Sequence, residues 1–301
     1  MFKLPEIEPE LPVLIAGATG SGKSDLALEL AVAQGRAVVN ADALQVYGCW
    51  RKLSARPEIA DENRARHLLY GHVDRDAAYS VGTWLGEVRH ILATPSSAAP
   101  VIVGGTGLYF SCLTEGLAEI PAIAPEVRER SDRILARGGL ADLCGDLERD
   151  DPDTFASIDL ANPKRVQRAW EVYQSTGRGL LDWQRFAPPP ILPLKNAAAF
   201  VLDGPVDWLR NRLEARFQSM VENGALDEVA ANLDLLDSNK PAAQAIGGRE
   251  LAAYLRGETT LEAAIEAANI STRQYAKRQR SWFRNRMKDW TFLQISQPTW
   301  G

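Results

Sequence analysis

A glycine-rich segment near the amino terminus constrains this chain more than any other feature. Residues 17–24, GATGSGKS, fit the pattern G-x-x-x-x-G-K-[ST]. The apolar run Leu11 to Ala16 precedes the segment, and residues 26–32 carry apolar side chains at helical spacing after it. A buried strand, a glycine loop and a helix in this order are typical of a phosphate-binding loop in an α/β protein.

This loop predicts a site for a polyphosphate. Its backbone N–H groups can converge on one anion, and the start of the following helix adds partial positive charge. Lys23 adds a full charge, and the Ser24 hydroxyl can hold a magnesium ion, so we expect Mg²⁺ as a cofactor. The expected phosphate contacts are Gly17, Ala18, Thr19, Gly20, Ser21, Gly22, Lys23 and Ser24. The loop alone does not distinguish a nucleotide from a prenyl diphosphate, and a glycine-rich turn without a ligand is the plain alternative.

Further apolar runs predict the rest of the fold. Residues 37–41, 101–103 and 200–202 have the composition of short buried parallel strands. Residues 119–196 instead show helical periodicity and many charges, and the run Pro188 to Pro190 suits a linker. From Val206 the pattern is helical almost to the end. We therefore expect an α/β, P-loop NTPase-like core of residues 1–118 and 197–301, with a parallel sheet flanked by helices, a mainly helical insertion domain of residues 119–196, and C-terminal helices.

Composition limits the possible partners. The chain has 301 residues, with 34 basic and 39 acidic side chains and a net charge of −5, so it has no overall attraction to nucleic acid. No apolar run approaches the roughly 20 residues that cross a bilayer. The first ten residues, MFKLPEIEPE, are acidic and do not resemble a signal peptide. We expect a cytoplasmic monomer without a membrane partner.

Local charge near the carboxyl terminus favours an RNA contact. Residues 273–288 contain seven Lys or Arg and no acidic residue. Four of the basic residues have the spacing of one helix face: Arg273, Lys277, Arg280 and Arg284. Such a stripe can contact phosphates, although a solvated helix face is the alternative. The interleaved aromatic residues Tyr275, Trp282 and Phe283 are expected in the core.

Several ordered motifs resemble the tRNA dimethylallyltransferase family. After the phosphate loop come residues 40–47, NADALQVY, and residues 103–109, VGGTGLY. The likeness continues through residues 162–165 (NPKR), 244–247 (QAIG) and 272–279 (TRQYAKRQ), so it covers nearly the whole chain. The resemblance implies transfer of a dimethylallyl group from dimethylallyl diphosphate to N6 of the adenine 3′ to the anticodon in tRNA, with release of diphosphate.

The resemblance also suggests which residues act. In a parallel sheet the ligand crevice lies beyond the carboxyl ends of the strands, where the loop, Asp42 and Thr106 should converge. Asp42 is our candidate general base for the adenine amine, and Thr106 is a candidate donor to the bridging oxygen of the diphosphate. Arg212 and Arg216 are candidate clamps on the diphosphate. Without the resemblance, a strand-end carboxylate that caps a turn and a simple turn residue remain the alternatives for Asp42 and Thr106.

The RNA contacts that the resemblance implies fall on three segments and two isolated residues, and the basic stripe adds two more. They are Asp42, Ala43, Leu44, Gln45, Thr106, Arg128, Ala161, Asn162, Pro163, Lys164, Arg165, Gln244, Ala245, Ile246, Gly247, Gly248 and Arg249, with Lys277 and Arg280 from the stripe.

Some positions depart from the family pattern. Leu53 replaces a glycine, whose backbone geometry leucine is expected to resist. Ala43 stands where serine is common, Gly248 where tyrosine is frequent, and Tyr70 where aspartate often follows His-Leu. These changes affect the expected fit to RNA more than the chemistry.

Other functions remain open at this point. A P-loop kinase of small molecules or nucleosides would use the same loop, with Asp203 as a strand-end ligand for magnesium. An enzyme that prenylates free adenine nucleotides is a close relative, against which the long insertion and the basic tail argue. A non-catalytic P-loop protein that binds RNA would not need Asp42.

Overall fold

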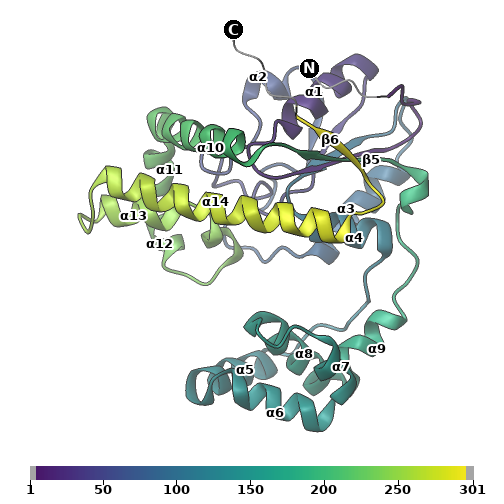
Figure 1. Ribbon diagram of the computed structural model, residues 1–301, viewed down its shortest axis with the longest axis vertical. Helices are drawn as coiled ribbons and strands as arrows, with labels where there is room; N and C mark the ends of the chain where they lie inside the picture. Colours follow the sequence, from purple (N-terminus) through teal and green to yellow (C-terminus); the bar gives the residue numbers. More distant parts are fainter. Residues whose placement is uncertain (1–4, 296–301) are drawn as a thin grey trace. The chain divides into compact units, whose positions relative to one another are not determined.

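The computed structural model describes residues 5–295, which contain a parallel sheet of six strands (Figure 1). The strand order is β3-β2-β4-β1-β5-β6, and every neighbouring pair is parallel. The strands are β1 (Val13–Gly17), β2 (Val38–Asn40), β3 (His67–Leu68), β4 (Val101–Gly104), β5 (Ala198–Asp203) and β6 (Thr291–Gln294). The α/β fold class expected from the sequence is confirmed.

The central strands are apolar because both faces of the sheet are covered. Every residue of β1 and β4 is buried, and Val13 pairs with both Val101 and Ala198 in the register of the sheet. One apolar cluster joins these strands to α1 (Lys23–Gln34), through Leu26, Ala27 and Ala31. Parallel strands with two covered faces need such continuous apolar runs, which is why the sequence predicted them.

Two strands were not predicted, and both lie at edges of the sheet. β3 has only two residues, each partly exposed, and pairs with Val38 and Val39. β6 follows a long helix, pairs with β5, and exposes its terminal residues Thr291 and Gln294. The expectation that the chain stays helical almost to its end is therefore wrong for β6. Short, partly exposed strands lack the apolar run on which the other strands were recognised.

The helices of the core follow the strands. They are α1, α2 (Ile59–Glu62), α3 (Val81–Ala93), α4 (Gly107–Glu115), α10 (Val206–Met220), α11 (Leu226–Ala230), α12 (Leu233–Leu236), α13 (Gly248–Leu255) and α14 (Leu261–Arg286), with short turns η1 (Leu194–Asn196), η2 (Val221–Ala225) and η3 (Pro241–Gln244). α14 has 26 residues, begins at the N-cap Thr260, and contacts α13, α10 and β1 (Figure 1). A second apolar cluster, which includes Trp50, Phe217 and Leu251, holds α10, α11, α13 and α14 around the loop after β2.

The chain divides into two compact units. The first contains residues 1–114 and 191–301, and the second contains residues 115–190. The second unit holds α5 (Pro125–Gly138), α6 (Leu140–Asp150), α7 (Pro152–Ser157), α8 (Pro163–Thr176) and α9 (Leu180–Arg185), packed around Leu143, Leu147 and Trp170. The second unit ends before residue 196, the predicted end of the insertion. Leu192 is buried in the first unit, where its N–H donates to the Leu113 carbonyl (3.1 Å).

Between residues 5 and 295, no helix is both long and apolar enough to cross a membrane.

Candidate active site

The loop between β1 and α1 has the backbone of an anion cradle. Gly20 (φ 78°) and Gly22 (φ 82°) adopt left-handed conformations that side chains rarely tolerate, which explains the glycines at these positions. Gly20, Gly22, Lys23 and Ser24 line a cavity of about 610 Å³, which we call the phosphate cavity. Gly17, Ala18 and Ser21 line neither this cavity nor the one described below.

Six cations line the phosphate cavity: Lys23, Arg51, Lys52, Arg56, Arg212 and Arg216. Lys23 comes from the start of α1, and Arg212 and Arg216 lie one turn apart on α10. Burial lowers the pKa of Lys23 to about 8, because desolvation outweighs the attraction of the nearby Asp42 carboxylate, and Arg216 lowers it further. An anion in this cavity would restore the charge of Lys23 and relieve the repulsion among the cations.

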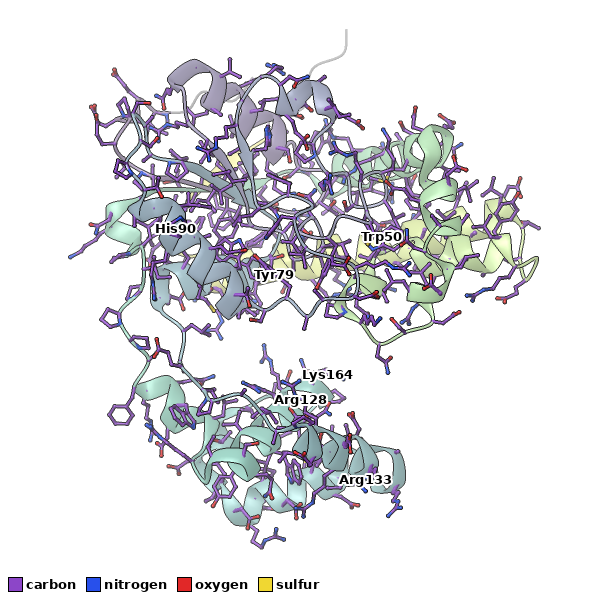
Figure 2. The ribbon with its side chains drawn as sticks, turned by 180° about the vertical axis from the view of Figure 1, so that it is seen from behind. Trp50, Tyr79, His90, Arg128, Arg133 and Lys164 are labelled. Atoms are coloured by element: carbon purple, nitrogen blue, oxygen red, sulfur yellow. The ribbon has the colours of Figure 1, made fainter. Side chains whose placement is uncertain are left out.

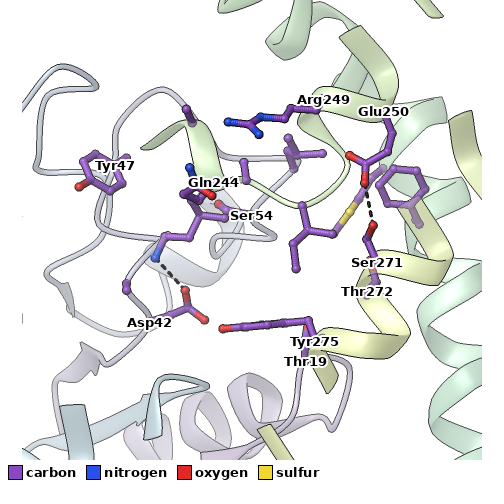
Figure 3. A pocket seen from close by; sticks show the side chains of 18 of the residues that line it. Thr19, Asp42, Tyr47, Ser54, Gln244, Arg249, Glu250, Ser271, Thr272 and Tyr275 are labelled. Carbon is purple, nitrogen blue, oxygen red and sulfur yellow. Dashed lines mark hydrogen bonds between the residues drawn. The ribbon is translucent and has the colours of Figure 1, made fainter. Parts of the chain in front are cut away.

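Asp42 lies just beyond the carboxyl end of β2 and is held in place by its own loop. Its N–H donates to Asn40 Oδ1 (2.8 Å), and its Oδ1 accepts from Leu44 N–H (2.9 Å). The buried Asn40 side chain also donates to the carbonyls of Asp42 and Leu69 (3.0 Å each). These bonds fix the Asp42 backbone and leave its second carboxylate oxygen directed into a cavity (Figure 3).

This second cavity, which we call the acceptor cavity, has a volume of about 670 Å³. Arg216 and Met220 line both cavities, so the two meet along α10. Lys23 and Asp42 lie close enough for the charge of Asp42 to raise the pKa of the lysine. The structure therefore brings together the cationic loop and the carboxylate that the sequence placed at one edge of the sheet.

Thr106 joins the same site through the turn after β4. Its Oγ1 accepts from the N–H of Ala43 (3.0 Å), and its own N–H donates to the Ala41 carbonyl (3.2 Å). Thr106 is thus bonded to both neighbours of Asp42 in the chain. Because the hydroxyl oxygen is used as an acceptor, its hydrogen remains available to a ligand.

Thr19 faces the acceptor cavity and not the phosphate cavity. Its side chain lines the space around Asp42, and its N–H donates to Gln279 Oε1 (2.9 Å). The contact of Thr19 with a phosphate stays a prediction, and in this structure α14 uses its N–H.

Tyr275 is a site residue that sequence reasoning placed in the core. It lines the acceptor cavity, and Figure 3 shows its hydroxyl directed toward the Asp42 carboxylate. Burial raises the pKa of this phenol, and the charge of Asp42 raises it further, so the hydroxyl stays a proton donor at neutral pH. Its neighbour Phe283 does lie in the core, at 1 % exposure.

The predicted RNA contacts of the core divide into two groups. Ala43, Leu44, Gln244, Ala245, Ile246 and Arg249 all line the acceptor cavity. Gln45 does not line it, and its amide instead donates to the carbonyls of Ser54 and Ala55 (3.0 and 2.9 Å). Gly247 and Gly248 are buried and line neither cavity of the site, so the structure gives no support to their predicted contact with RNA.

Leu236 leaves little room for a side chain at residue 248, and Leu53 packs against the same glycine. A Cβ atom on Gly248 would lie 2.8 Å from Leu236 Cδ2 and 3.5 Å from Leu53 Cδ2, so the two leucines fill the space of any side chain there. The expected backbone conflict at Leu53 is absent. In residues 5–295 the non-glycine residues with left-handed φ are Ala55 (49°) and Leu69 (62°). Two departures from the family pattern thus accommodate each other.

The basic stripe of α14 is mostly paired with the core. Arg280 Nε donates to Asp203 Oδ1 (2.9 Å) and Arg280 Nη2 to the Gly204 carbonyl (2.9 Å), and the arginine side chain is only 14 % exposed. Arg284 also binds Asp203, at 2.8 Å. The RNA contact of Arg280 stays a prediction, but in this structure the end of β5 engages its guanidinium.

Two other cations of α14 are differently placed. Lys277 is exposed and lines neither cavity of the site. Arg278, which we had not singled out, lines the acceptor cavity and lies over the Tyr275 ring, 5.8 Å from its centroid. Arg249 reaches over the same cavity from the start of α13 (Figure 3).

The remaining predicted RNA contacts belong to the second unit. Arg128 is exposed on α5, and Ala161, Pro163, Lys164 and Arg165 are exposed at the start of α8. Asn162 caps α8 by accepting from Arg165 N–H (3.3 Å). Figure 2 shows Arg128 and Lys164 on the same side of this unit. They form a basic surface at one end of the α5 and α8 pair.

The donors at the phosphate cavity suit a magnesium ion that is shared with a ligand. No cluster of three or more His, Cys, Asp or Glu in the described part of the chain is placed to hold a metal by itself. The Ser24 hydroxyl and the Asp25 carboxylate both line the phosphate cavity. This small set of oxygen donors fits Mg²⁺, which usually keeps water and phosphate oxygens as its other ligands.

Sequence comparisons identify the relatives of this chain. Residues 45–286 match the IPP transferase family and residues 12–70 match the isopentenyl transferase family. The chain is 57 % identical to the tRNA dimethylallyltransferase of Dinoroseobacter shibae over 288 residues, which is 96 % of each chain. It is 55 % identical to that of Cereibacter sphaeroides, over 96 % of this chain and 98 % of the relative.

Solved structures show the same fold. The tRNA isopentenylpyrophosphate transferase of Bacillus halodurans matches 97 % of this chain and 92 % of its own, with a TM-score of 0.68 and 28 % identity. A eukaryotic dimethylallyltransferase that acts on tRNA matches 96 % of this chain and 75 % of its own, with a TM-score of 0.81 and 25 % identity. From its sequence, its P-loop fold and these relatives, the chain belongs to the tRNA dimethylallyltransferase family.

Proposed function

We propose that this protein transfers a dimethylallyl group from dimethylallyl diphosphate to N6 of the adenine that lies 3′ to the anticodon in tRNA, with release of diphosphate. One observation carries the proposal: a cationic loop built on Lys23 and a carboxylate at Asp42 open onto two cavities that meet at Arg216. A prenyl diphosphate can enter one cavity and a nucleobase the other, so that carbon passes between them.

The phosphate cavity supports departure of the diphosphate. The bond from the allylic carbon to oxygen breaks readily when the negative charge on the leaving oxygens is stabilised. Lys23, Arg212 and Arg216 would surround those oxygens with positive charge, and the amides of Gly20, Gly22, Lys23 and Ser24 would add donors. Mg²⁺, held by Ser24 and Asp25, would neutralise further charge on the diphosphate.

The acceptor cavity supports attack by the adenine amine. The lone pair of this amine is delocalised into the ring, so loss of its proton must accompany formation of the new carbon–nitrogen bond. We propose that the free oxygen of Asp42, which is directed into this cavity, takes that proton. Thr106, bonded to the backbone beside Asp42, is our proposed donor to the bridging oxygen as the carbon leaves it.

The adenine must leave the anticodon stack to reach Asp42, and such extrusion costs a few kcal/mol. Contacts to the opened loop have to offset that cost. Arg249 and Arg278 supply charge at the acceptor cavity, and Arg128, Lys164 and Arg165 supply it on the second unit. We propose that these cations hold the anticodon arm.

The alternative function, a P-loop kinase, would need a strand-end carboxylate that is free to bind magnesium. Asp203, the strand-end carboxylate it requires, is bound by Arg280 and Arg284. A carboxylate held by two guanidinium groups is a poor ligand for a metal. Because the substrate is tRNA, we propose that the protein acts in the cytoplasm, and we propose that it acts as a monomer.

Incubation with labelled dimethylallyl diphosphate and unmodified tRNA tests the function. We expect label in tRNA, and nucleoside mass analysis should find it as N6-dimethylallyladenosine. Asp42→Ala should lower the transfer rate by roughly 100-fold to 10,000-fold, the range of a general base. Absence of transfer by the unaltered protein would reject the function, whereas transfer that survives Asp42→Ala would reject only the base.

A further inference from the structure

The buried side-chain amide of Gln279 on α14 has no role in the proposed reaction. Gln279 is 5 % exposed, and both ends of its side chain are bonded to distant backbone. Its Oε1 accepts from Thr19 N–H (2.9 Å), and its Nε2 donates to the Gly105 carbonyl (2.9 Å). One bond needs an acceptor and the other a donor, so only one orientation of the amide satisfies both.

The two backbone groups that Gln279 joins belong to the two halves of the site. Thr19 lies in the phosphate loop, and Gly105 directly precedes Thr106 in the turn after β4. Thr106 is bonded in turn to Ala43, beside Asp42. Hydrogen bonds and peptide links therefore connect the phosphate loop, through Gln279 and the β4 turn, to the backbone beside Asp42.

The glycine at position 105 makes this contact possible. A Cβ atom there would lie 2.3 Å from Gln279 Nε2, and no real side chain permits that distance. Gly105 φ is not left-handed, so the close approach of the amide explains this glycine better than its backbone conformation does. Only glycine at position 105 leaves room for the Gln279 amide.

We propose that Gln279 is a positioning residue, which sets the distance between the diphosphate in the phosphate loop and the Thr106–Asp42 pair. β1 and β4 are already paired in the sheet, but the loops beyond their ends are not, and there Gln279 bridges them. An error of about 1 Å between reacting groups can cost on the order of 100-fold in rate. This inference rests on the proposed function.

Gln279→Met tests the inference because it keeps the length of the side chain and removes both hydrogen bonds. We expect kcat to fall roughly 10-fold to 100-fold, while KM for tRNA and the Kd for inorganic diphosphate stay within about threefold. Gln279→Glu keeps the acceptor for Thr19 but turns a carboxylate oxygen toward the Gly105 carbonyl. It should lose as much kcat as the methionine variant.

Asn285→Met is the matched control. It makes a comparable change at an exposed position of the same helix, where the side chain bonds only Ser281, and kcat should not change. Gly105→Ala displaces the glutamine from the other side and should reproduce the loss of kcat.

Several outcomes would overturn the inference. They are an unchanged kcat in Gln279→Met, a loss expressed only in KM for tRNA, and a loss that disappears on cooling together with a lowered Tm. If the methionine variant does not fold, an unchanged kcat in Gly105→Ala overturns it instead. Failure of the unaltered protein to transfer any label would instead reject the proposed function.

Discussion

Two aspartates at the carboxyl edge of the sheet have different environments. Asp42 follows β2, and Asp203 ends β5. Asp203 is 8 % exposed and bound by two arginines of α14, whereas Asp42 is bound by amides of its own loop and turns its free oxygen to a cavity. The same strand-end position thus yields a structural carboxylate or an available one. The difference lies in which side chains α14 presents to each: arginines to Asp203 and a tyrosine to Asp42.

The largest effect on stability should come from the paired aspartate. Asp203→Asn leaves Arg280 buried without a counter-charge, and breaking such a pair typically costs about 3 kcal/mol. Denaturant unfolding should report this loss at pH 7. Asp42→Asn, which has no arginine pair to break, should unfold like the unaltered protein. A loss of stability at Asp42 equal to that at Asp203 would contradict the comparison.

The same pair predicts how stability depends on pH. Burial alone would raise the pKa of Asp203, but the hydrogen bond from Arg284 and the charge of Arg280 outweigh it and lower the pKa below its ordinary value. A depressed carboxyl pKa stabilises the fold above the unfolded value of about 3.9, and this stabilisation is lost as the pH falls further. The gap in unfolding free energy between the unaltered protein and Asp203→Asn should therefore close below about pH 4.

Removal of the Tyr275 hydroxyl tests whether this group assists Asp42 in the transfer reaction. Tyr275→Phe keeps the ring in the acceptor cavity and takes away the donor that faces Asp42. Loss of the polar group beside the proposed base should slow single-turnover transfer roughly tenfold, less than loss of the base itself. Phe283→Tyr or Phe283→Leu would report on core packing and not on this contact. An unchanged or faster rate in Tyr275→Phe would dismiss the role.

Lys23 should make diphosphate binding sensitive to pH. Burial lowers its pKa to about 8, and a bound anion favours the charged form. Affinity should therefore fall by up to about tenfold per pH unit above pH 8, with proton uptake on binding. Calorimetry in buffers of different ionisation enthalpy measures that uptake. Lys23→Arg should bind without it, and uptake that persists in this variant would point to another group.

The smallest expected effect is on tRNA binding, and it should differ between two cations of α14. Arg278→Gln removes a charge at the acceptor cavity, whereas Lys277→Gln removes one that lies outside it. We expect Arg278→Gln to weaken tRNA binding several-fold and to reduce the dependence of log K on log salt by about one phosphate contact. Lys277→Gln should have a smaller effect on the affinity for tRNA and on its salt dependence. Equal effects of the two variants would mean that proximity to the cavity does not matter.

Local patterns were enough to predict the phosphate loop and four strands. Each of these strands is a buried apolar run, and the loop needs left-handed glycines at Gly20 and Gly22. The edge strands β3 and β6 were missed because a strand with one neighbour and exposed residues has no such run. Their existence depends on the sheet beside them.

The pairing of the basic residues could not be predicted in the same way. Helical spacing placed Arg280 correctly on one face of α14, but the face meets Asp203, 77 residues away in the chain. Tyr275 and Gln279 became recognisable only once α14 crossed the ends of β1 and β4. Sequence periodicity gives the direction of a side chain and leaves its partner unknown.

The fit of Leu53 to Gly248 limits how parts of this protein can be exchanged. A loop grafted from a relative with glycine at position 53 would leave a hole beside Gly248, and a tyrosine introduced at position 248 alone would collide with Leu236. Chimeras that carry both replacements, with room made at Leu236, should tolerate the exchange better than either single graft. Residues nearly two hundred positions apart therefore have to be transplanted as a unit.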